Sequence, residues 1–359
     1  YDIWLRLSNR SFEKGLNSFT YVGKVLQRLF KSELPIVEKI QITFITDPEK
    51  VKEKFGESME TYEKRDAKAR GLKDEDVDAF YGCSLCQSFA PTHVCVITPQ
   101  RYSNCGAISW FDGRAAARVD PKGPVFRIDK GDCVDPARGE YSGANEAVKM
   151  KSGGEIARVW LYTAFGHPHT SCGCFEAVAF YMPEVDGLGV VHRGFQGMAP
   201  NGLPFSTLAD STAGGRQVDG FHGVSIEYMR SPKFLHADGG WNRLVWLPEV
   251  IKERVRDFIP KDLVDKIPTE KEATNLEELK DFLEKKSHPV VQSWKAAAVE
   301  VIAEKLVERE RLEVPVQAQI PLTVPSVPVG VASGVGGFRI ILRNAKIHAK
   351  KVRILSKEK

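Results

Sequence analysis

Apolar and polar residues alternate along the segment 39–46 ("KIQITFIT"), and this period of two predicts a β-strand. A helix is predicted directly after it, because Asp47 can cap a helix and Pro48 suits its first position. This helix should run to about Ala69 and, being highly charged, should be a solvated connector between domains. A second helix is predicted to open within residues 74–80 ("DEDVDAF").

From about residue 81 to residue 247 the chain is rich in glycine, proline, cysteine and aromatic residues. Short strands are predicted at Arg158–Ala164 and Ala177–Met182, and "DGLGVVHR" (186–193) predicts a hairpin turn that enters a strand. Glycine-rich loops follow between Asn201 and Trp246. Loops of this kind often carry functional sites on a rigid scaffold.

Helices are predicted again from about residue 248 to residue 311. Thr274 and Glu277 have the spacing of a capping box for a helix that Pro289 would end, and another helix is predicted from about Val291. Residues 314–337 are rich in proline, valine and glycine and predict an extended linker. The basic segment 338–359 resembles two alternating strands, a short β-hairpin. Mixed strands and helices predict an α/β to α+β fold, with mixed sheets flanked by helices.

The composition is that of a globular protein, with 359 residues, 42% hydrophobic and 27% charged. The net charge of +4 comes from the last 22 residues, whose eight basic residues and one acid carry +7, so the remainder carries −3. No broad basic surface for nucleic acid is therefore indicated. No apolar run approaches the roughly 18 residues of a membrane span. Because the chain begins with Tyr1 and without a signal peptide, we expect a fragment or processed form of a longer cytoplasmic protein.

Four of the seven cysteines lie within "YGCSLCQSFAPTHVCVITPQRYSNCGAISW". Clustered cysteines in a reducing compartment usually bind metal or take part in catalysis. Four thiolates at this spacing can hold zinc or an iron–sulfur cluster. The single C-x2-C pair and the apolar neighbours favour a cubane cluster, but spacing alone leaves both metals open. His93, inside the run, is expected to be a structural histidine. The four cysteines are Cys83, Cys86, Cys95 and Cys105.

A second group, Cys172-Gly173-Cys174, offers two thiolates with two backbone amides between them. If both amides lose their protons, the four donors can lie in one plane, and Gly173 has no Cβ to obstruct this arrangement. Ni(II) and Cu(II) prefer such tetragonal geometry, whereas zinc does not. The thiolates can still bridge to a second metal. A redox dithiol and two zinc ligands remain alternative interpretations.

Taken together, these motifs resemble the beta subunit of the CO dehydrogenase/acetyl-CoA synthase complex. The resemblance runs from about Lys39 to Trp294 and takes in "GCSLCQSFAPTHVC", "RYSNCGAISW", "SCGCFEAV", "YMPEVDG", "PNGLPFSTLAD" and "SPKFLHADGGWNRLVW". The six-cysteine pattern is its most specific element.

The resemblance implies that Cys83, Cys86, Cys95 and Cys105 hold a [4Fe–4S] cluster and that Cys86 also bridges to a proximal nickel ion. It further implies that Cys172 and Cys174 bridge this nickel to a distal, square-planar nickel, which their sulfurs and the backbone nitrogens of Gly173 and Cys174 hold. Phe89 matches a phenylalanine that lies against the proximal nickel, although simple packing on the cluster explains it equally well. His167 and His169 are expected to position the loop, and Cys133 matches no ligand.

The activity implied is that of an acyltransferase, CO-methylating acetyl-CoA synthase. It joins CO, a methyl group from a methylated corrinoid iron–sulfur protein and coenzyme A into acetyl-CoA, or runs the reverse cleavage. A CO dehydrogenase subunit is the further partner implied, although the region that docks it is expected to be missing here. An alternative is a non-catalytic iron–sulfur or zinc module with a redox or structural role.

The same resemblance divides the chain into parts. Residues 1–75 would be the end of a coenzyme A-binding middle domain with its connector helix, and 76–313 the catalytic domain, with the metal cluster on loops. Residues 314–337 would be the linker and 338–359 the basic β segment. On this interpretation we expect weak binding of coenzyme A by the chain.

Overall fold

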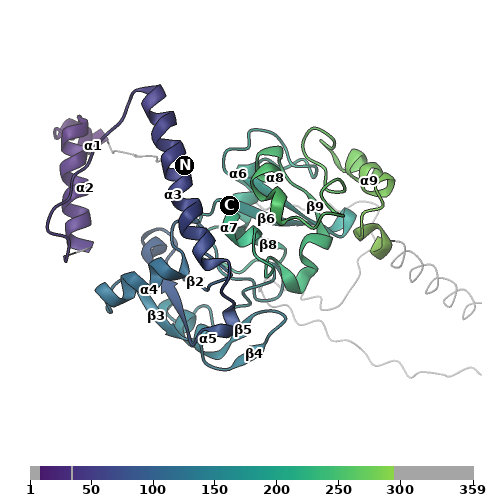
Figure 1. Ribbon diagram of the computed structural model, residues 1–359, viewed down its shortest axis with the longest axis horizontal. Coiled ribbons are helices and arrows are strands. Elements are labelled where there is room, and N and C mark those ends of the chain that lie inside the picture. Colours follow the sequence, from purple (N-terminus) through teal and green to yellow (C-terminus); the bar gives the residue numbers. More distant parts are fainter. Residues whose placement is uncertain (1–8, 34, 295–359) are drawn as a thin grey trace, which may run out of the picture. The chain divides into compact units, whose positions relative to one another are not determined.

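The computed structural model describes residues 9–33 and 35–294, all within one compact unit, Tyr1–Lys305. Within these ranges the fold is mixed α/β, as predicted, with one three-stranded, one two-stranded and one four-stranded sheet (Figure 1). The predicted linker 314–337 and hairpin 338–359 lie outside the described residues.

The strand predicted at 39–46 is absent, and the segment is neither strand nor helix. It follows helices α1 (Asn9–Glu13) and α2 (Phe19–Glu33). Phe44 stacks on Phe19 of α2, with ring centroids 5.0 Å apart, and the Gln27 amide donates to the carbonyl of Ile40 at 2.8 Å. The alternating apolar residues therefore pack against a helix. No strand in the described ranges pairs with the segment.

Helix α3 (Pro48–Ala69) confirms the predicted charged helix and its start. The Asp47 carboxylate accepts from the backbone N–H of Lys50 at 3.0 Å, and Pro48 occupies the first turn. The carboxyl-terminal part of α3 is not solvated throughout, since Asp66 and Ala69 are buried. Just beyond it, the Arg70 guanidinium pairs with Glu227 at 2.7 Å, which fixes this end to a distant part of the chain.

The first sheet has the antiparallel order β2 (Cys95–Ile97), β1 (Ala79–Cys83) and β3 (Val125–Asp129), and it holds two cysteines of the first group, Cys83 and Cys95. The helix predicted within 74–80 is only a 3₁₀ turn, Asp74–Asp76, because the apolar residues that follow it enter β1. Helix α4 packs on β1 and β3 (Figure 1), and its Ser109 and Asp112 form a capping box. The other elements are α4 (Trp110–Val119), followed by the pair β4 (Cys133–Asp135) and β5 (Glu140–Tyr141), and by α5 (Ser142–Lys151).

The second sheet has the order β8-β6-β7-β9, with the β7–β9 pair parallel. Strand β6 confirms the prediction at Ala177–Met182, and β7 (Gly187–His192) confirms the turn and strand within 186–193. The strand predicted at Arg158–Ala164 is wrong: only Trp160 forms an isolated bridge, to Pro168. The remaining elements are α6 (Phe205–Thr212), β8 (Phe221–Val224), α7 (Ile226–Met229) and β9 (Leu244–Trp246).

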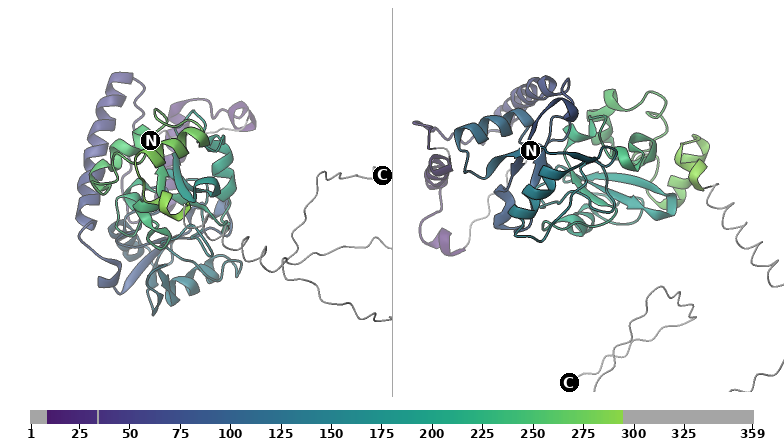
Figure 2. Two further views of the ribbon diagram at one scale, coloured as in Figure 1. Left: turned by 90° about the vertical axis from the view of Figure 1, so that its right-hand side faces the viewer. Right: turned by 90° about the horizontal axis from the view of Figure 1, so that it is seen from below.

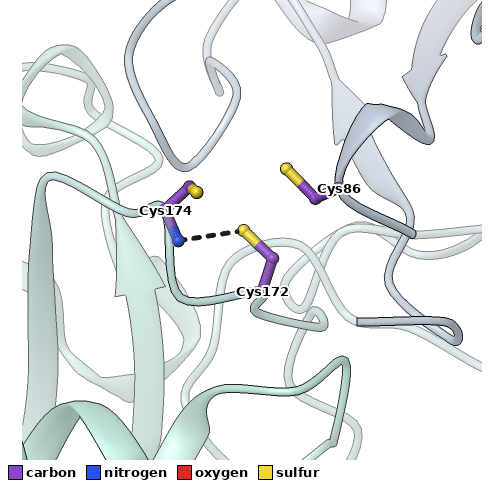
Figure 3. A group of neighbouring side chains, drawn as sticks. All are labelled: Cys86, Cys172 and Cys174. Carbon is purple, nitrogen blue, oxygen red and sulfur yellow. Dashed lines mark hydrogen bonds between the residues drawn. The ribbon is translucent and has the colours of Figure 1, made fainter. Parts of the chain in front are cut away.

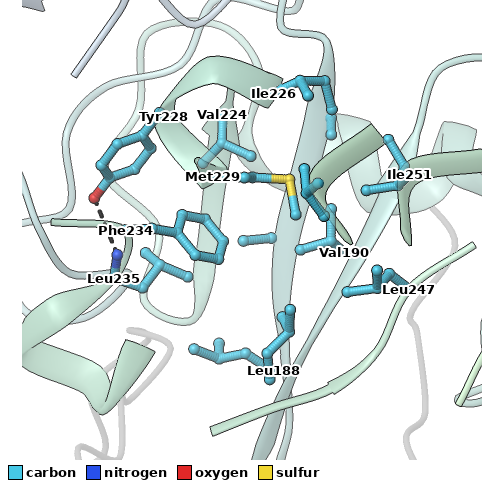
Figure 4. Close-up of a cluster of buried hydrophobic side chains, with 14 of the residues drawn as sticks. Leu188, Val190, Val224, Ile226, Tyr228, Met229, Phe234, Leu235, Leu247 and Ile251 are labelled. Carbon is cyan, nitrogen blue, oxygen red and sulfur yellow. Dashed lines mark hydrogen bonds between the residues drawn. The ribbon is translucent and has the colours of Figure 1, made fainter. Parts of the chain in front are cut away.

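The main core fills one face of this sheet and closes it against α7 and α8 (Glu249–Val255). Leu188, Val190 and Met229 are fully buried there (Figure 4). Helix α9 (Leu276–Lys285) lies against β9, and the same elements are seen from two other directions in Figure 2. Burial of apolar side chains against this sheet stabilises its strands.

The predicted capping box of α9 is displaced by one residue. Asn275, not Thr274, is the N-cap, and its side chain accepts from the backbone N–H of Glu278 at 3.0 Å. The Glu278 carboxylate accepts in turn from the hydroxyl of Thr274 at 2.7 Å. The helix ends at Lys285, before Pro289, because Ser287 adopts a positive φ of 50°. Residues 290–294 are helical again, and the rest of the helix predicted from Val291 lies outside the described residues.

Candidate metal centre

The Cys-Gly-Cys segment is a loop that leads into β6. The backbone N–H of Cys174 donates to the Cys172 sulfur at 3.2 Å, so this nitrogen already faces that sulfur (Figure 3). Gly173 has a φ of +116°, which L-residues rarely adopt. The carbonyls of Ser171 and Cys172 accept from Gly215 and Gly214, which tie the loop to its neighbour.

Three thiols converge at this loop. The sulfurs of Cys86, Cys172 and Cys174 all lie within 4.8 Å of one another (Figure 3). Cys86 comes from the 3₁₀ turn Leu85–Ser88 after β1, so the group joins segments far apart in the sequence. Cys172 is buried, whereas Cys174 is exposed.

The three thiols share their protons unequally. Hydrogen bonds from the Cys172 and Cys86 thiols lower the pKa of Cys174 to about 3. The hydrogen bond to Cys174 raises the pKa of Cys172 to about 12, and hydrogen bonds to Cys172 and Cys174 raise that of Cys86. One thiolate therefore accepts hydrogen bonds from two thiols. A soft metal ion can replace the two thiol protons and bind the sulfurs instead.

Of the other three predicted ligands, Cys83 and Cys95 lie on the first sheet, whereas Cys105 lies in the loop between β2 and α4, its sulfur 3.4 Å from the Ser103 hydroxyl. Cys83 stands directly opposite Cys95 in the β1–β2 register. Burial raises the pKa of the Cys83 thiol to about 11, and burial followed by the charges of Cys83, Cys172 and Cys105 raises that of Cys95. These thiols therefore interact electrostatically. Among the described residues, however, only Cys86, Cys172 and Cys174 come within a distance at which they could share one metal ion.

Phe89 closes the turn that carries Cys86 and donates its backbone N–H to the Cys86 carbonyl at 3.2 Å. Its side chain is 56% exposed. Leu85, at the start of the same turn, is 51% exposed. The turn that carries Cys86 therefore also carries two apolar side chains that are largely exposed.

The predicted structural histidines hold the loop in place. The His93 ring lies 3.1 Å from the hydroxyl of Thr170 and 3.3 Å from the Cys95 sulfur. His169 Nε2 accepts from the backbone N–H of Val96 at 2.8 Å, which joins the loop to β2. Burial lowers the pKa of His93 to about 4 and lowers that of His169, so both are neutral near pH 7. The carbonyl of His167 accepts from the backbone N–H of Trp160 at 2.7 Å.

A fully buried arginine, which the sequence pattern did not single out, lies behind these histidines. Arg101 donates to the carbonyls of Leu161 and Val96, each at 3.1 Å, and to the side chains of Asn104 and His222 at 3.1 Å and 2.9 Å. Because a guanidinium only donates, the His222 nitrogen accepts. Arg101 thus connects β2 to β8.

Arg193 is a second residue that sequence reasoning missed. It follows β7 directly, and its guanidinium donates to the carbonyl oxygen of Gly173. Its charge also contributes to the lowered pKa of Cys174. Arg193 is the last residue of the predicted turn and strand within 186–193, and no local pattern there indicates a contact with Gly173, 20 residues away.

The structure thus defines a mixed α/β protein in which three thiols from distant segments gather where a metal ion could bind. A family model described as the C-terminal part of the ACS/CODH beta subunit matches residues 62–295. A second, described as the CO dehydrogenase/acetyl-CoA synthase complex beta subunit, matches residues 1–51. The chain belongs to this family of beta subunits.

Curated relatives support the assignment. The chain is 52% identical to acetyl-CoA decarbonylase/synthase complex subunit beta 2 of Methanosarcina thermophila, over 100% of this chain and 77% of that protein. It is 51% identical to the subunit beta of Methanothermobacter thermautotrophicus, over 99% and 76%. A solved structure of the C-terminal domain of an acetyl-coenzyme A synthase alpha subunit is 39% identical over 33% of this chain and 95% of that chain, with a TM-score of 0.31.

In the described part of the chain, no helix is long and apolar enough to cross a membrane.

Proposed function

We propose that the chain is the catalytic subunit that makes or cleaves acetyl-CoA at a Ni–Ni–[4Fe–4S] centre. The observation that supports the proposal most directly is the convergence of Cys86 with Cys172 and Cys174. In the proposed centre Cys86 belongs both to the four-cysteine group and to the nickel site, so it has to stand beside the Cys-Gly-Cys loop.

The residues fit the proposed metals. Thiolates are the preferred ligands of iron–sulfur clusters, and Cys83, Cys86, Cys95 and Cys105 would hold the [4Fe–4S] unit. Cys86, Cys172 and Cys174 would hold the proximal nickel. The distal nickel would take the sulfurs of Cys172 and Cys174 with the backbone nitrogens of Gly173 and Cys174. The orientation of the Cys174 nitrogen toward the Cys172 sulfur supports that donor set.

When bound, the nickel centre would supply the joining of CO to a methyl group and the transfer of the product to the thiol of coenzyme A. The protein's own residues would position and shield it. Phe89 and Leu85, on the turn that carries Cys86, are the apolar side chains that would limit the access of water if they closed over the bound centre. No acid–base pair is assigned, since the proposed centre does the difficult chemistry.

The proposed substrates are CO, coenzyme A and the methyl group of a methylated corrinoid iron–sulfur protein. The proposed partners are that protein and a CO dehydrogenase subunit. Support comes from the relatives, which are named as beta subunits of an acetyl-CoA decarbonylase/synthase complex. We also propose that residues 76–313 form the catalytic domain and that residues 1–75 belong to a coenzyme A-binding region.

The first experiment is a metal analysis after anaerobic purification and nickel treatment. About four iron ions and about two nickel ions per chain are expected from the proposed centre. Four iron ions with one nickel and one copper or zinc ion would indicate the proposed site filled with another metal. Iron without nickel, after repeated loading, would contradict the proposal and favour a redox module.

A further inference from the structure

The side chain of Arg193 contacts the peptide group between Gly173 and Cys174. Its guanidinium donates to the carbonyl oxygen of Gly173, although the two residues come from different elements. The Arg193 backbone is fixed, because its N–H donates to the carbonyl of Glu176 at 3.3 Å. Arg193 is exposed, and the contact that its guanidinium makes with the loop is this bond to a backbone oxygen.

That oxygen has a particular chemical relation to the chelate loop. The carbonyl of Gly173 and the nitrogen of Cys174 belong to one planar, resonance-coupled peptide group. If this nitrogen gives up its proton to become a metal ligand, resonance places part of the negative charge on the Gly173 oxygen. The nitrogen already faces the Cys172 sulfur at 3.2 Å (Figure 3). Arg193 thus donates to the atom that would receive the charge.

The proposed planar donor set needs such a countercharge. Two thiolates and two deprotonated amides carry more negative charge than one Ni(II) ion neutralises. Hydrogen bonds from a charged donor to an anionic oxygen are about twice as strong as neutral ones.

We propose that Arg193 is a positioning residue for the planar nickel ion, which holds the Gly173–Cys174 peptide group and stabilises its deprotonated, metal-bound form. This inference rests on the proposed function, since it assumes that nickel binds through backbone nitrogen. The step is a ligand exchange without redox change: a nickel–nitrogen bond would form as a nickel–water bond breaks, and the peptide N–H would lose its proton to water.

Three substitutions separate charge from hydrogen bonding. Arg193→Met removes both, Arg193→Gln keeps a neutral donor, and Arg193→Lys keeps the charge. Arg127→Met is the matched control, because Arg127 is an exposed arginine on β3 whose loss changes the net charge equally. Each protein is loaded with iron and nickel anaerobically. Nickel affinity is then measured by competition with a chelator, and the visible absorption of planar Ni(II) and the iron content are recorded.

We expect Arg193→Met to bind the planar nickel about threefold to tenfold more weakly, because solvent screens the hydrogen bond of this exposed arginine. Its planar Ni(II) absorption should fall at a fixed chelator concentration, while iron content stays at the parental value. Arg193→Gln should resemble Arg193→Met, Arg193→Lys should fall between them and the parent, and Arg127→Met should equal the parent.

Parental nickel affinity in Arg193→Met would overturn the inference and leave the proposed function standing. Parental affinity in Arg193→Gln alone would overturn the role of charge and reduce Arg193 to a neutral tether. Absence of planar nickel from the parent itself would overturn both the inference and the proposed function.

Discussion

At the scale of single residues, the most consequential side chain outside the thiol group is Arg101. It is fully buried, and its hydrogen bonds end on two carbonyls, an amide oxygen and a neutral histidine, with no carboxylate among them. Burial lowers the pKa of its guanidinium. Arg101 therefore connects the two sheets through hydrogen bonds, and none of the ion pairs among residues 9–33 and 35–294 includes it.

Arg101→Met should destabilise the fold strongly, because it leaves several buried acceptors without donors. We expect a loss of about 3 kcal/mol or more in the free energy of unfolding. Urea titration under anaerobic conditions measures it, with Arg127→Met as the exposed control, for which about 0.5 kcal/mol or less is expected. Equal losses in the two variants would contradict the role of Arg101.

The free energy of unfolding should depend on pH through the protonation of His288. Its Nε2 lies 3.1 Å from the carbonyl of Leu244, and its Nδ1 accepts from the backbone N–H of Val290 at 3.2 Å, which is the pattern of a neutral ring. A second ring proton would meet the Val290 N–H. Burial accordingly lowers the pKa of His288 from 6.5 to about 4.

Because the folded pKa lies below the unfolded value, the unfolded chain binds the extra proton first as pH falls. The contribution of His288 to stability is complete above pH 6.5 and is lost as pH falls toward 4. Between pH 7 and pH 5 the parent should lose about 2 kcal/mol more than His288→Gln, whose amide can still donate to Leu244. Chemical unfolding at both pH values measures this difference, and identical pH profiles would rule the assignment out.

At the scale of elements, the chelate loop depends on the backbone conformation of Gly173. A Cβ at this position would meet only the Cβ of Ala213, at 3.7 Å, which is an ordinary contact. The φ of +116° is thus the obstacle to any other residue, not the available space. The glycine sets the shape of the loop through its backbone.

Gly173→Ala should therefore lower nickel binding without removing iron, because the loop must move to relieve about 1–3 kcal/mol of strain. Metal analysis of the anaerobically loaded variant tests this. Gly153→Ala is the matched control, since Gly153 also has a positive φ, of 70°, and open space around it, but it lies after α5. Parental nickel content in Gly173→Ala would show that the loop tolerates the change.

The elements that the sequence predicted correctly are those with local signals. Helix α3 has its cap at Asp47, and β6 and β7 consist of apolar runs on either side of a turn. The strand prediction for 39–46 is wrong because an alternating pattern shows only that one face of the segment is apolar. The pattern does not show whether a strand or a helix packs against that face. The donors around the thiols were missed for a similar reason: Arg101 meets His222, 121 residues away, and no local pattern encodes that pairing.

At the scale of the whole described body, the thiol group connects two parts of the fold. Cys86 comes from the turn after β1, whereas Cys172 and Cys174 come from the loop before β6. A metal ion bound by all three would link the first sheet to the second. Binding to the folded chain alone stabilises that chain by mass action.

Nickel added to the iron-loaded protein should raise its thermal midpoint by about 5–10 °C when nickel is at a hundredfold excess over its dissociation constant. Anaerobic calorimetry measures the shift, and a chelator should reverse it. Cys174→Ala should keep the effect of iron and lose that of nickel. An equal nickel effect in Cys174→Ala would mean that the ion binds elsewhere.

The exposed Cys174 thiolate also makes the metal-free chain sensitive to oxidation. Thiolates react with oxidants far faster than thiols, and a sulfenic acid formed at Cys174 would condense with the neighbouring Cys172 or Cys86 thiol into a disulfide. Such a bond consumes two of the sulfurs that the metals require. Exposure of the metal-free chain to an oxidant should therefore lower the amount of metal that it can later bind, unless a reductant first restores the thiols.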